Sequence, residues 1–121
     1  MRKLFLAAAA AMSAIAFASP ASATTAEKLN VVCNTPSTEI SHEVNLALCV
    51  GYIHGVIDHE SLRSENVAAN GIFCIYSEVS SAELRGIVRR YLATRYERGT
   101  ETANVLVGEA LARAFPCRKA G

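Results

Sequence analysis

Two stripes of hydrophobic residues in the last third of the 121-residue chain follow the period of an α-helix. In each stripe the apolar positions lie three and four residues apart with polar residues between them, which is typical of a helix with one buried face. The first stripe comprises Leu84, Ile87, Val88, Tyr91 and Leu92. The second comprises Ala103, Leu106, Val107, Ala110, Leu111, Ala114 and Phe115, and Pro116 ends it. These patterns predict two helices separated by a turn at Gly99.

Capping signals indicate where two helices begin. Ser80 and Glu83 have the spacing of a capping box, in which the hydroxyl and the carboxylate each satisfy a free backbone amide of the first turn. Thr24 and Glu27 have the same spacing, so a short helix is predicted to start there. Residues 34–37, Asn-Thr-Pro-Ser, end it because the residue before a proline is disfavoured in the helical conformation.

The longest helical pattern runs from Thr38 or Glu39 to about Arg63. It has two apolar stripes, one of Ala47, Gly51 and Gly55 and another of Leu46, Val50, Ile53 and Ile57. A helix that is apolar on more than one face is typically surrounded by other helices, so this segment is predicted to be the buried centre of the domain. Each glycine costs about 1 kcal/mol relative to alanine in a helix. We therefore expect a neighbouring backbone or ring to pack closely against Gly51 and Gly55.

The helical pattern fails between residues 64 and 79, where turn-forming residues surround a short apolar segment, 72–76. We interpret this region as a loop pinned by Cys74. A strand is the alternative, but the chain has no second strand-like run of comparable strength to pair with it. The predicted fold is all-α, a small four-helix domain with a long central helix.

The first 23 residues have the features of a secretory signal peptide. Arg2 and Lys3 precede an apolar run, and Ala21-Ser22-Ala23 is a small-residue cleavage site. The run of about 14 residues is shorter than the roughly 20 that a membrane-spanning helix needs. The expected organisation is a signal peptide at 1–23, cleaved after Ala23, and one exported domain at 24–121.

Four cysteines lie in the predicted mature domain, an even number that favours two disulfides in an oxidising compartment. None forms a C-x-x-C pair, and their spacing differs from that of structural zinc sites. If the helices alternate up and down, Cys74 and Cys117 meet at one edge of the bundle. The extended link after Cys33 spans about the same 16 Å that the next helix rises before Cys49. The preferred pairing is Cys33–Cys49 and Cys74–Cys117.

The charge of the mature chain is nearly balanced. Without Arg2 and Lys3, 10 basic residues face 11 acidic ones, so the net charge is about −1. Such a chain has no overall attraction for nucleic acid or for an anionic membrane, and neither is an expected partner.

Several segments together resemble the Rap/Tai immunity-protein family. They are Cys49-x-Gly51-Tyr52-Ile53-x-Gly55-x-x-Asp58, Phe73-Cys74, Tyr91-Leu92 and Ala110-Leu111-x-x-Ala114-Phe115-Pro116-Cys117. The resemblance covers nearly all of the mature chain, although Tyr76 stands where the family commonly has proline. It implies an all-helical periplasmic protein, often a homodimer, that blocks a peptidoglycan amidase delivered by a type VI secretion system. Gly51, Tyr52, Gly55, Asp58, Phe115 and Pro116 belong to the shared scaffold motif.

No pattern indicates catalysis, a cofactor or a metal centre. His54 and Asp58 share a helix face, but His59 is turned about 100° away from Asp58, so we favour packing and hydrogen-bonding roles over a metal site. Tyr52 is interpreted as a core aromatic rather than a binding residue. No serine lies in a strained glycine elbow, and the cysteines are expected to be oxidised, so the protein is predicted not to be an enzyme.

The candidate partner-binding residues lie on the third helix and the turn after it. Arginines 85, 89 and 90 are predicted on or beside the outer face of that helix, as a solvated face or as a surface for an acidic partner. The resemblance implies that this helix and the following loop block the effector's cleft. The corresponding loop, 95–101, has one large aromatic side chain, which suits an interface hot spot as well as it suits an ordinary turn. The residues assigned to the interface are Arg89, Arg95, Tyr96, Glu97 and Arg98.

Two functions are consistent with these features. The first is a periplasmic immunity protein that occludes an amidase effector. The alternative is a periplasmic helical housekeeping protein, such as a stress chaperone or an envelope assembly partner, built on the same scaffold.

Overall fold

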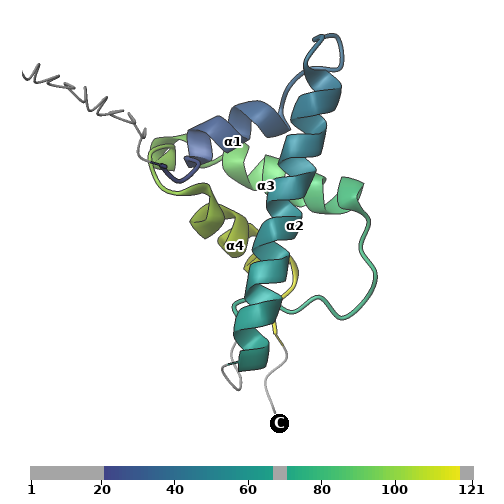
Figure 1. The fold of residues 1–121 in the computed structure, drawn as a ribbon, viewed down its shortest axis with the longest axis vertical. Helices are drawn as coiled ribbons and strands as arrows, with labels where there is room; N and C mark the ends of the chain where they lie inside the picture. Colours follow the sequence, from purple (N-terminus) through teal and green to yellow (C-terminus); the bar gives the residue numbers. More distant parts are fainter. Residues whose placement is uncertain (1–20, 67–70, 118–121) are drawn as a thin grey trace, which may run out of the picture.

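The computed structural model describes residues 21–66 and 71–117 of the chain. Within these ranges the fold is all-α, as predicted, and the only β-structure is an isolated bridge between Thr25 and Thr102. The elements are α1 (Ala26–Cys33), α2 (His42–Asn66), α3 (Ser81–Ala93), the 3₁₀ helix η1 (Tyr96–Arg98) and α4 (Ala103–Ala114). The long helix α2 runs along the long axis of the molecule, and α1 and α3 run across it (Figure 1).

One predicted helix start is confirmed and another is shifted by one residue. Ser80 caps α3, and its Oγ accepts a hydrogen bond from the Glu83 amide at 3.1 Å. The cap of α1 is Thr25 rather than Thr24, with its Oγ1 accepting from the Lys28 amide. The carbonyl of Thr24 instead accepts from the Ala103 amide at 2.8 Å, so this residue joins α1 to α4.

Helix α2 is long, as predicted, but begins at His42 because residues 36–41 form turns. The prediction that it is buried on all sides is wrong. Its inner face carries the fully buried Cys49 and Ile53, whereas Gly51 and Gly55 are exposed, with no atom within 4 Å of the position that a Cβ would occupy. No residue in the described ranges packs closely against these glycines, contrary to the prediction. The three shorter helices α1, α3 and α4 cover only one side of α2.

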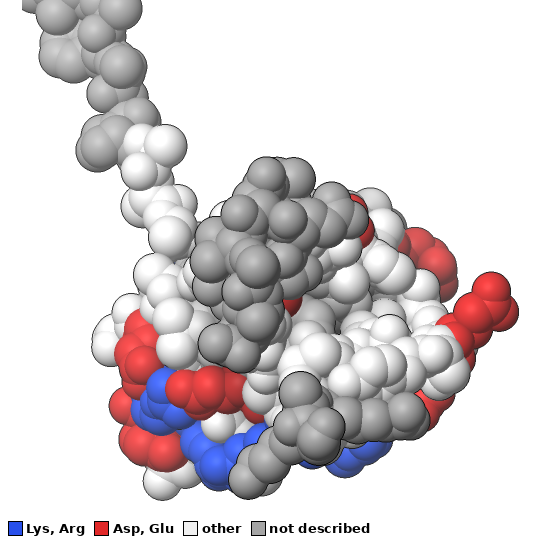
Figure 2. All heavy atoms as spheres, turned by 90° about the horizontal axis from the view of Figure 1, so that it is seen from below, with Lys and Arg blue, Asp and Glu red and all other residues white. Residues whose placement is uncertain are grey.

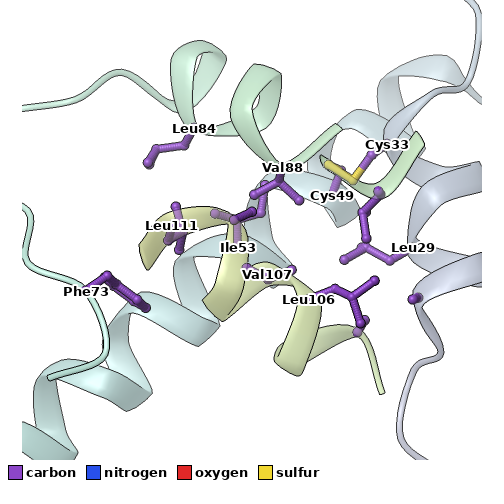
Figure 3. Close-up of a cluster of buried hydrophobic side chains, with 14 residues drawn as sticks. Leu29, Cys33, Cys49, Ile53, Phe73, Leu84, Val88, Leu106, Val107 and Leu111 are labelled. Atoms are coloured by element: carbon purple, nitrogen blue, oxygen red, sulfur yellow. A yellow bond between two sulfur atoms is a disulfide. The ribbon is translucent and has the colours of Figure 1, made fainter. Parts of the chain in front are cut away.

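The core lies where α2, α3 and α4 meet, with α1 closing one side (Figure 3). Both predicted stripes of the last third are present, since Leu84, Val88 and Leu92 from α3 face Leu106 and Leu111 from α4. All five side chains are at most 3% exposed. At roughly 2 kcal/mol for each buried aliphatic side chain, these contacts are a main source of stability in so small a domain.

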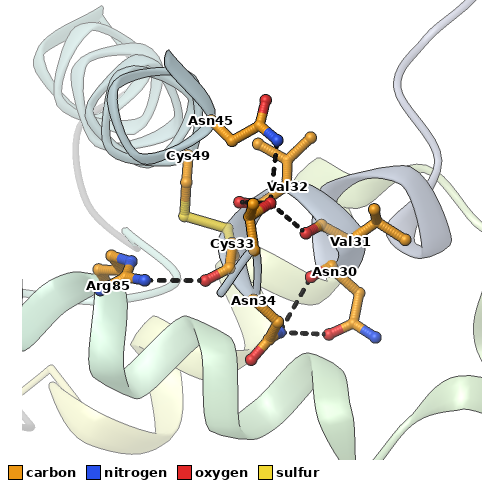
Figure 4. The surroundings of a disulfide bond; sticks show 9 residues. Asn30, Val31, Val32, Cys33, Asn34, Asn45, Cys49 and Arg85 are labelled. Carbon is orange, nitrogen blue, oxygen red and sulfur yellow. Dashed lines mark hydrogen bonds between the residues drawn. A yellow bond between two sulfur atoms is a disulfide. The ribbon is translucent and has the colours of Figure 1, made fainter. Parts of the chain in front are cut away.

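The disulfides are Cys33–Cys49 and Cys74–Cys117, as predicted. The up-and-down arrangement from which the second pairing was inferred is not observed, because α1 and α3 cross α2 (Figure 1). The first disulfide joins the end of α1 to α2 in the core, beside the Arg85 side chain, which donates a hydrogen bond to the Cys33 carbonyl at 3.2 Å (Figure 4). A cation at this position also interacts favourably with the C-terminal end of the α1 dipole.

The segment before α3 is a loop pinned by Cys74, as predicted, at least over residues 71–80. The Cys74 amide donates to the Phe115 carbonyl at 2.9 Å, and the Ile72 amide donates to the buried Glu60 carboxylate at 2.8 Å. These bonds connect the loop to the end of α4 and to α2.

The predicted signal peptide falls almost entirely on residues 1–20, which lie outside the described residues. In the part that is described, no helix combines the length and apolar character needed to cross a membrane.

Candidate partner-binding surface

The turn after α3 is held rigidly by Arg98. Its guanidinium binds Glu101 through Nε and Nη2 and Glu109 through Nη1 and Nη2, so all four carboxylate oxygens accept from one side chain. The amide of Glu27 in α1 donates to the Gly99 carbonyl at 3.0 Å, which fixes the other side of the turn. A loop with this many internal bonds has little conformational freedom to lose on binding a partner.

Electrostatics within this network favour its charged form. Hydrogen bonds from Arg98 and from the Tyr91 hydroxyl lower the pKa of Glu109 to about 2. The hydrogen bond from Arg98 also lowers the pKa of Glu101, and the two carboxylates raise the pKa of Arg98. The three groups therefore remain ionised at neutral pH.

Tyr96 projects from this fixed turn. Its side chain is 83% exposed, the largest exposed fraction of any aromatic residue in the described part of the chain. Beside it lies a groove of about 360 Å³ between the turn and α1, and its lining includes Arg95 and the exposed Val31. Arg95, Tyr96, Glu97 and Arg98 thus lie together, although the donors of Arg98 are already engaged inside the protein.

The arginines of α3 do not all face solvent. Arg89 and Arg90 are exposed, as expected of a solvated face. Arg85 differs from that expectation, because it is only partly exposed and turns inward to bind the Cys33 carbonyl (Figure 4). Arg89 is therefore available to a partner, whereas Arg85 has a structural role.

Tyr91 forms the centre of a second groove, between α3 and α4. The guanidinium carbons of Arg95 and Arg113 lie 4.8 and 5.3 Å from the centroid of its ring, and its hydroxyl donates to Glu109 at 2.7 Å. This groove, which we call the arginine groove, has a volume of about 410 Å³ and also includes Arg90 and Thr94.

An uncharged strip runs along the outer side of α2. We call it the α2 outer face and define it by the exposed residues Val44, Ala47, Leu48, Gly51 and Gly55. The face borders a larger, mainly apolar trough of about 870 Å³ between α2 and α4. Tyr52 lines this trough while packing against the core, and burial raises the pKa of its hydroxyl. In Figure 2, charged atoms lie mostly at the edges of the face shown, and uncharged residues fill much of its visible middle.

The histidines of α2 have no metal-binding geometry. The Nε2 atom of His54 lies 3.0 Å from the Ser81 hydroxyl, which joins α2 to the start of α3, and Asp58 is exposed. Among the described residues, no three His, Cys, Asp or Glu side chains are grouped closely enough to hold a metal ion. All four cysteines are in disulfides, so none can act as a nucleophile.

A family model described as Rap1a immunity proteins matches residues 25–117, which is nearly the whole of the described domain. The chain belongs to the Rap1a immunity protein family. A search of curated proteins gives no match.

The residues by which the sequence resembles immunity proteins are mainly scaffold residues in this Rap1a family member. Cys49 and Cys74 are in the two disulfides. The carbonyl of Phe115, the C-cap of α4, accepts a hydrogen bond from the Cys74 amide, and Pro116 follows it. Gly51, Gly55 and Asp58 are exceptions, since the two glycines lie on the exposed α2 outer face and Asp58 is exposed as well.

The contacts around Tyr91 in this Rap1a family member are not predicted by the sequence pattern. The hydrophobic stripe predicts only that Tyr91 is buried, and no pattern indicates a role for Glu109 or Arg113 of α4. Arg95 follows Tyr91 by four residues, just beyond the C-cap of α3, and this spacing is a usable signal for a ring and a cation in contact. Glu109 and Arg113 meet them only through the packing of α4 on α3, which no local pattern reports.

Proposed function

We propose that this protein is a periplasmic immunity protein that binds a peptidoglycan amidase effector of a type VI secretion system and blocks its active-site cleft. The observation that carries the proposal is the match of residues 25–117 to the Rap1a immunity protein model. Inhibition occurs by steric occlusion and involves no chemical turnover. The producing cell is thereby protected from its own or a sibling's effector.

Two observations are compatible with action in the periplasm. Both disulfides join elements of the domain, and such bridges persist in oxidising compartments rather than in the cytosol. The sequence features of residues 1–23 supply the export signal.

The proposed inhibitory surface comprises Arg89, Arg95, Tyr96, Glu97 and Arg98. Tyr96 supplies a large, exposed ring on a turn that is already ordered, which is the type of residue that dominates interface energetics. Arg98 contributes by holding the turn in shape, and Arg89 and Arg95 supply charge beside it. A cleft that receives this turn is closed to peptidoglycan.

The test uses the purified mature chain and the amidases encoded in its own genome, beginning with any encoded by a neighbouring gene. We expect nanomolar binding, inhibition of peptidoglycan hydrolysis, and at least about tenfold weaker binding by Tyr96→Ala, as for a hot-spot tyrosine. The matched control is Tyr76→Ala, an exposed tyrosine on the segment before α3.

Two results would contradict parts of this proposal. Failure of the wild-type chain to bind or inhibit any of these amidases would refute the immunity function. Tight binding that Tyr96→Ala leaves unchanged would instead refute the assignment of the turn. The housekeeping alternative predicts that the chain suppresses aggregation of unrelated proteins, which a light-scattering assay measures directly.

We also propose that the chain forms a homodimer through the α2 outer face. The five residues of this face are uncharged and exposed, and its two glycines permit close approach of another helix backbone. A two-fold dimer pairs the same patch on both copies, which suits a straight apolar strip on a helix. The glycines, unexplained within one chain, then have a packing partner.

A further inference from the structure

The arginine groove brings three cationic side chains together. Arg90, Arg95 and Arg113 line the groove, and none has an ion-pair partner among residues 21–66 and 71–117. The carboxylate of Glu109 attracts Arg113, but it already accepts two hydrogen bonds from Arg98 and one from Tyr91. One shared carboxylate therefore faces three arginines, and the groove keeps a net positive charge.

Two of these charges lie against the Tyr91 ring. Each guanidinium carbon lies within 5.3 Å of the ring centroid, so the two cations are attracted to one ring while they repel each other. The ring is fixed by its hydrogen bond to Glu109. An anion that entered the groove would relieve this repulsion and would meet guanidinium donors already ordered by the ring.

The chemistry of the groove favours the carboxylates of a protein over a nucleic acid or an anionic membrane. Guanidinium groups form paired, planar hydrogen bonds with carboxylates. The groove holds about 410 Å³, enough for one or two acidic side chains. The mature chain as a whole carries about one net negative charge, which opposes binding of nucleic acid or of an anionic membrane.

We propose that the arginine groove receives aspartate or glutamate side chains of the effector protein. This inference rests on the proposed immunity function and extends the binding surface from the turn at Tyr96 to the channel between α3 and α4. Arg95 lines both the groove beside Tyr96 and the arginine groove, so the two parts form one continuous surface. An effector that binds this surface therefore has a site for an aromatic ring next to a segment of acidic side chains.

A peptide titration tests the groove without an effector. The probe is a capped tetraglutamate peptide added to the isotopically labelled mature chain, and the control probe is tetraglutamine. We expect chemical-shift changes at the Tyr91 ring and at the Arg95 and Arg113 guanidiniums with the glutamate peptide only. An equal response to tetraglutamine, no response at millimolar peptide, or tighter binding of a single-stranded oligonucleotide would overturn the proposal.

Binding to the amidase effector tests the same surface in the complex. The variants are Arg113→Gln and the double variant Arg95→Gln/Arg113→Gln, with Lys28→Gln, an exposed cation of α1, as the charge-matched control. The double variant should weaken binding at least about tenfold and flatten the dependence of Kd on salt, while Lys28→Gln changes Kd by less than about twofold. Circular dichroism checks that each variant is folded.

The two proposals fail in different ways. If the wild-type chain binds an amidase and the double variant binds it equally well, the groove inference is wrong and the immunity function stands. If the wild-type chain binds none, the immunity function is wrong, and the peptide titration alone decides whether the groove takes carboxylates.

Discussion

At the scale of single residues, the most informative group is the cluster around Arg98. The Arg98 guanidinium donates to the carboxylates of Glu101 and Glu109. Glu109 also accepts from the hydroxyl of Tyr91, whose ring contacts two further arginines. The cluster therefore has two roles. It orders the turn that presents Tyr96, and it engages the carboxylate of Glu109, so the arginine groove keeps a net positive charge.

The lowered pKa of Glu109 predicts a pH-dependent contribution to stability. Its folded-state pKa of about 2 lies below the ordinary value of 4.5, so its ionised form stabilises the fold above pH 4.5 and this contribution is lost as the pH falls toward 2. Because the carboxylate is partly exposed and screened by solvent, we expect a loss of about 1 kcal/mol. Urea unfolding at pH 6, 4 and 3 should show a smaller pH dependence for Glu109→Gln than for wild type.

The control for this measurement is Glu78→Gln, which removes an exposed glutamate of the segment before α3. This variant should retain the pH dependence of the wild-type protein. If Glu109→Gln also retained it, the Arg98 cluster would contribute nothing to the acid sensitivity of the fold.

At the scale of elements, α2 shows what a hydrophobic pattern can and cannot predict. In the stripe of Leu46, Val50, Ile53 and Ile57, Ile53 is in the core, Ile57 packs against it, and the other two residues are half-buried. The stripe of Ala47, Gly51 and Gly55 faces outward. Periodicity shows that both faces are apolar, but whether an apolar face meets its own chain or another one depends on how many neighbouring helices are present. The same limit applies to Tyr91, whose apolar position on the stripe concealed its polar contacts.

The proposed dimer gives a prediction for α2. Leu48→Glu places a charge at the middle of the α2 outer face, so it should convert a dimer to a monomer. Light scattering coupled to size-exclusion chromatography measures the mass directly. Val31→Glu is the matched control, because Val31 is exposed to a similar extent, 64% against 57%, but lies on α1.

A wild-type chain that is monomeric at all accessible concentrations would rule out this dimer. A dimer that Leu48→Glu leaves intact, or that Val31→Glu dissociates, would place the interface elsewhere. In either case the exposed glycines would lack the packing partner proposed for them.

At the scale of the whole molecule, one disulfide was predictable from lengths, because the link after Cys33 matches the rise of the next helix to Cys49. The pairing of Cys74 with Cys117 is correct although the up-and-down bundle from which it was inferred is not observed. The arginine groove was not predictable in this way. Tyr91 and Arg95 are related by their spacing, but Arg113 joins them only because α4 packs on α3, which no local pattern predicts.

The stability lost when each disulfide is removed should not depend on loop length alone. Loop entropy favours Cys74–Cys117, at about 4 kcal/mol against about 3 kcal/mol for Cys33–Cys49. However, Cys33 and Cys49 are fully buried, and replacing them by alanine removes two core sulfur atoms at about 1 kcal/mol each. We expect Cys33→Ala/Cys49→Ala to be the more destabilising pair by about 1 kcal/mol.

Urea unfolding of the two double variants, compared with wild type under oxidising conditions, measures this difference. The expectation is met if Cys33→Ala/Cys49→Ala is unfolded under conditions in which Cys74→Ala/Cys117→Ala remains folded. The opposite order would show that loop entropy outweighs core packing in this domain.

The bridge between Thr25 and Thr102 joins two segments that lie far apart in the sequence. The amides of Ala26 and Ala103 bind carbonyls of Glu101 and Thr24, so the first turn of α1 and the first turn of α4 complete each other. A chain that leaves a ribosome or a translocation channel with its N-terminus first exposes α1 long before this partner arrives. The native fold can therefore close only after nearly the whole domain has emerged, which delays its final assembly until release.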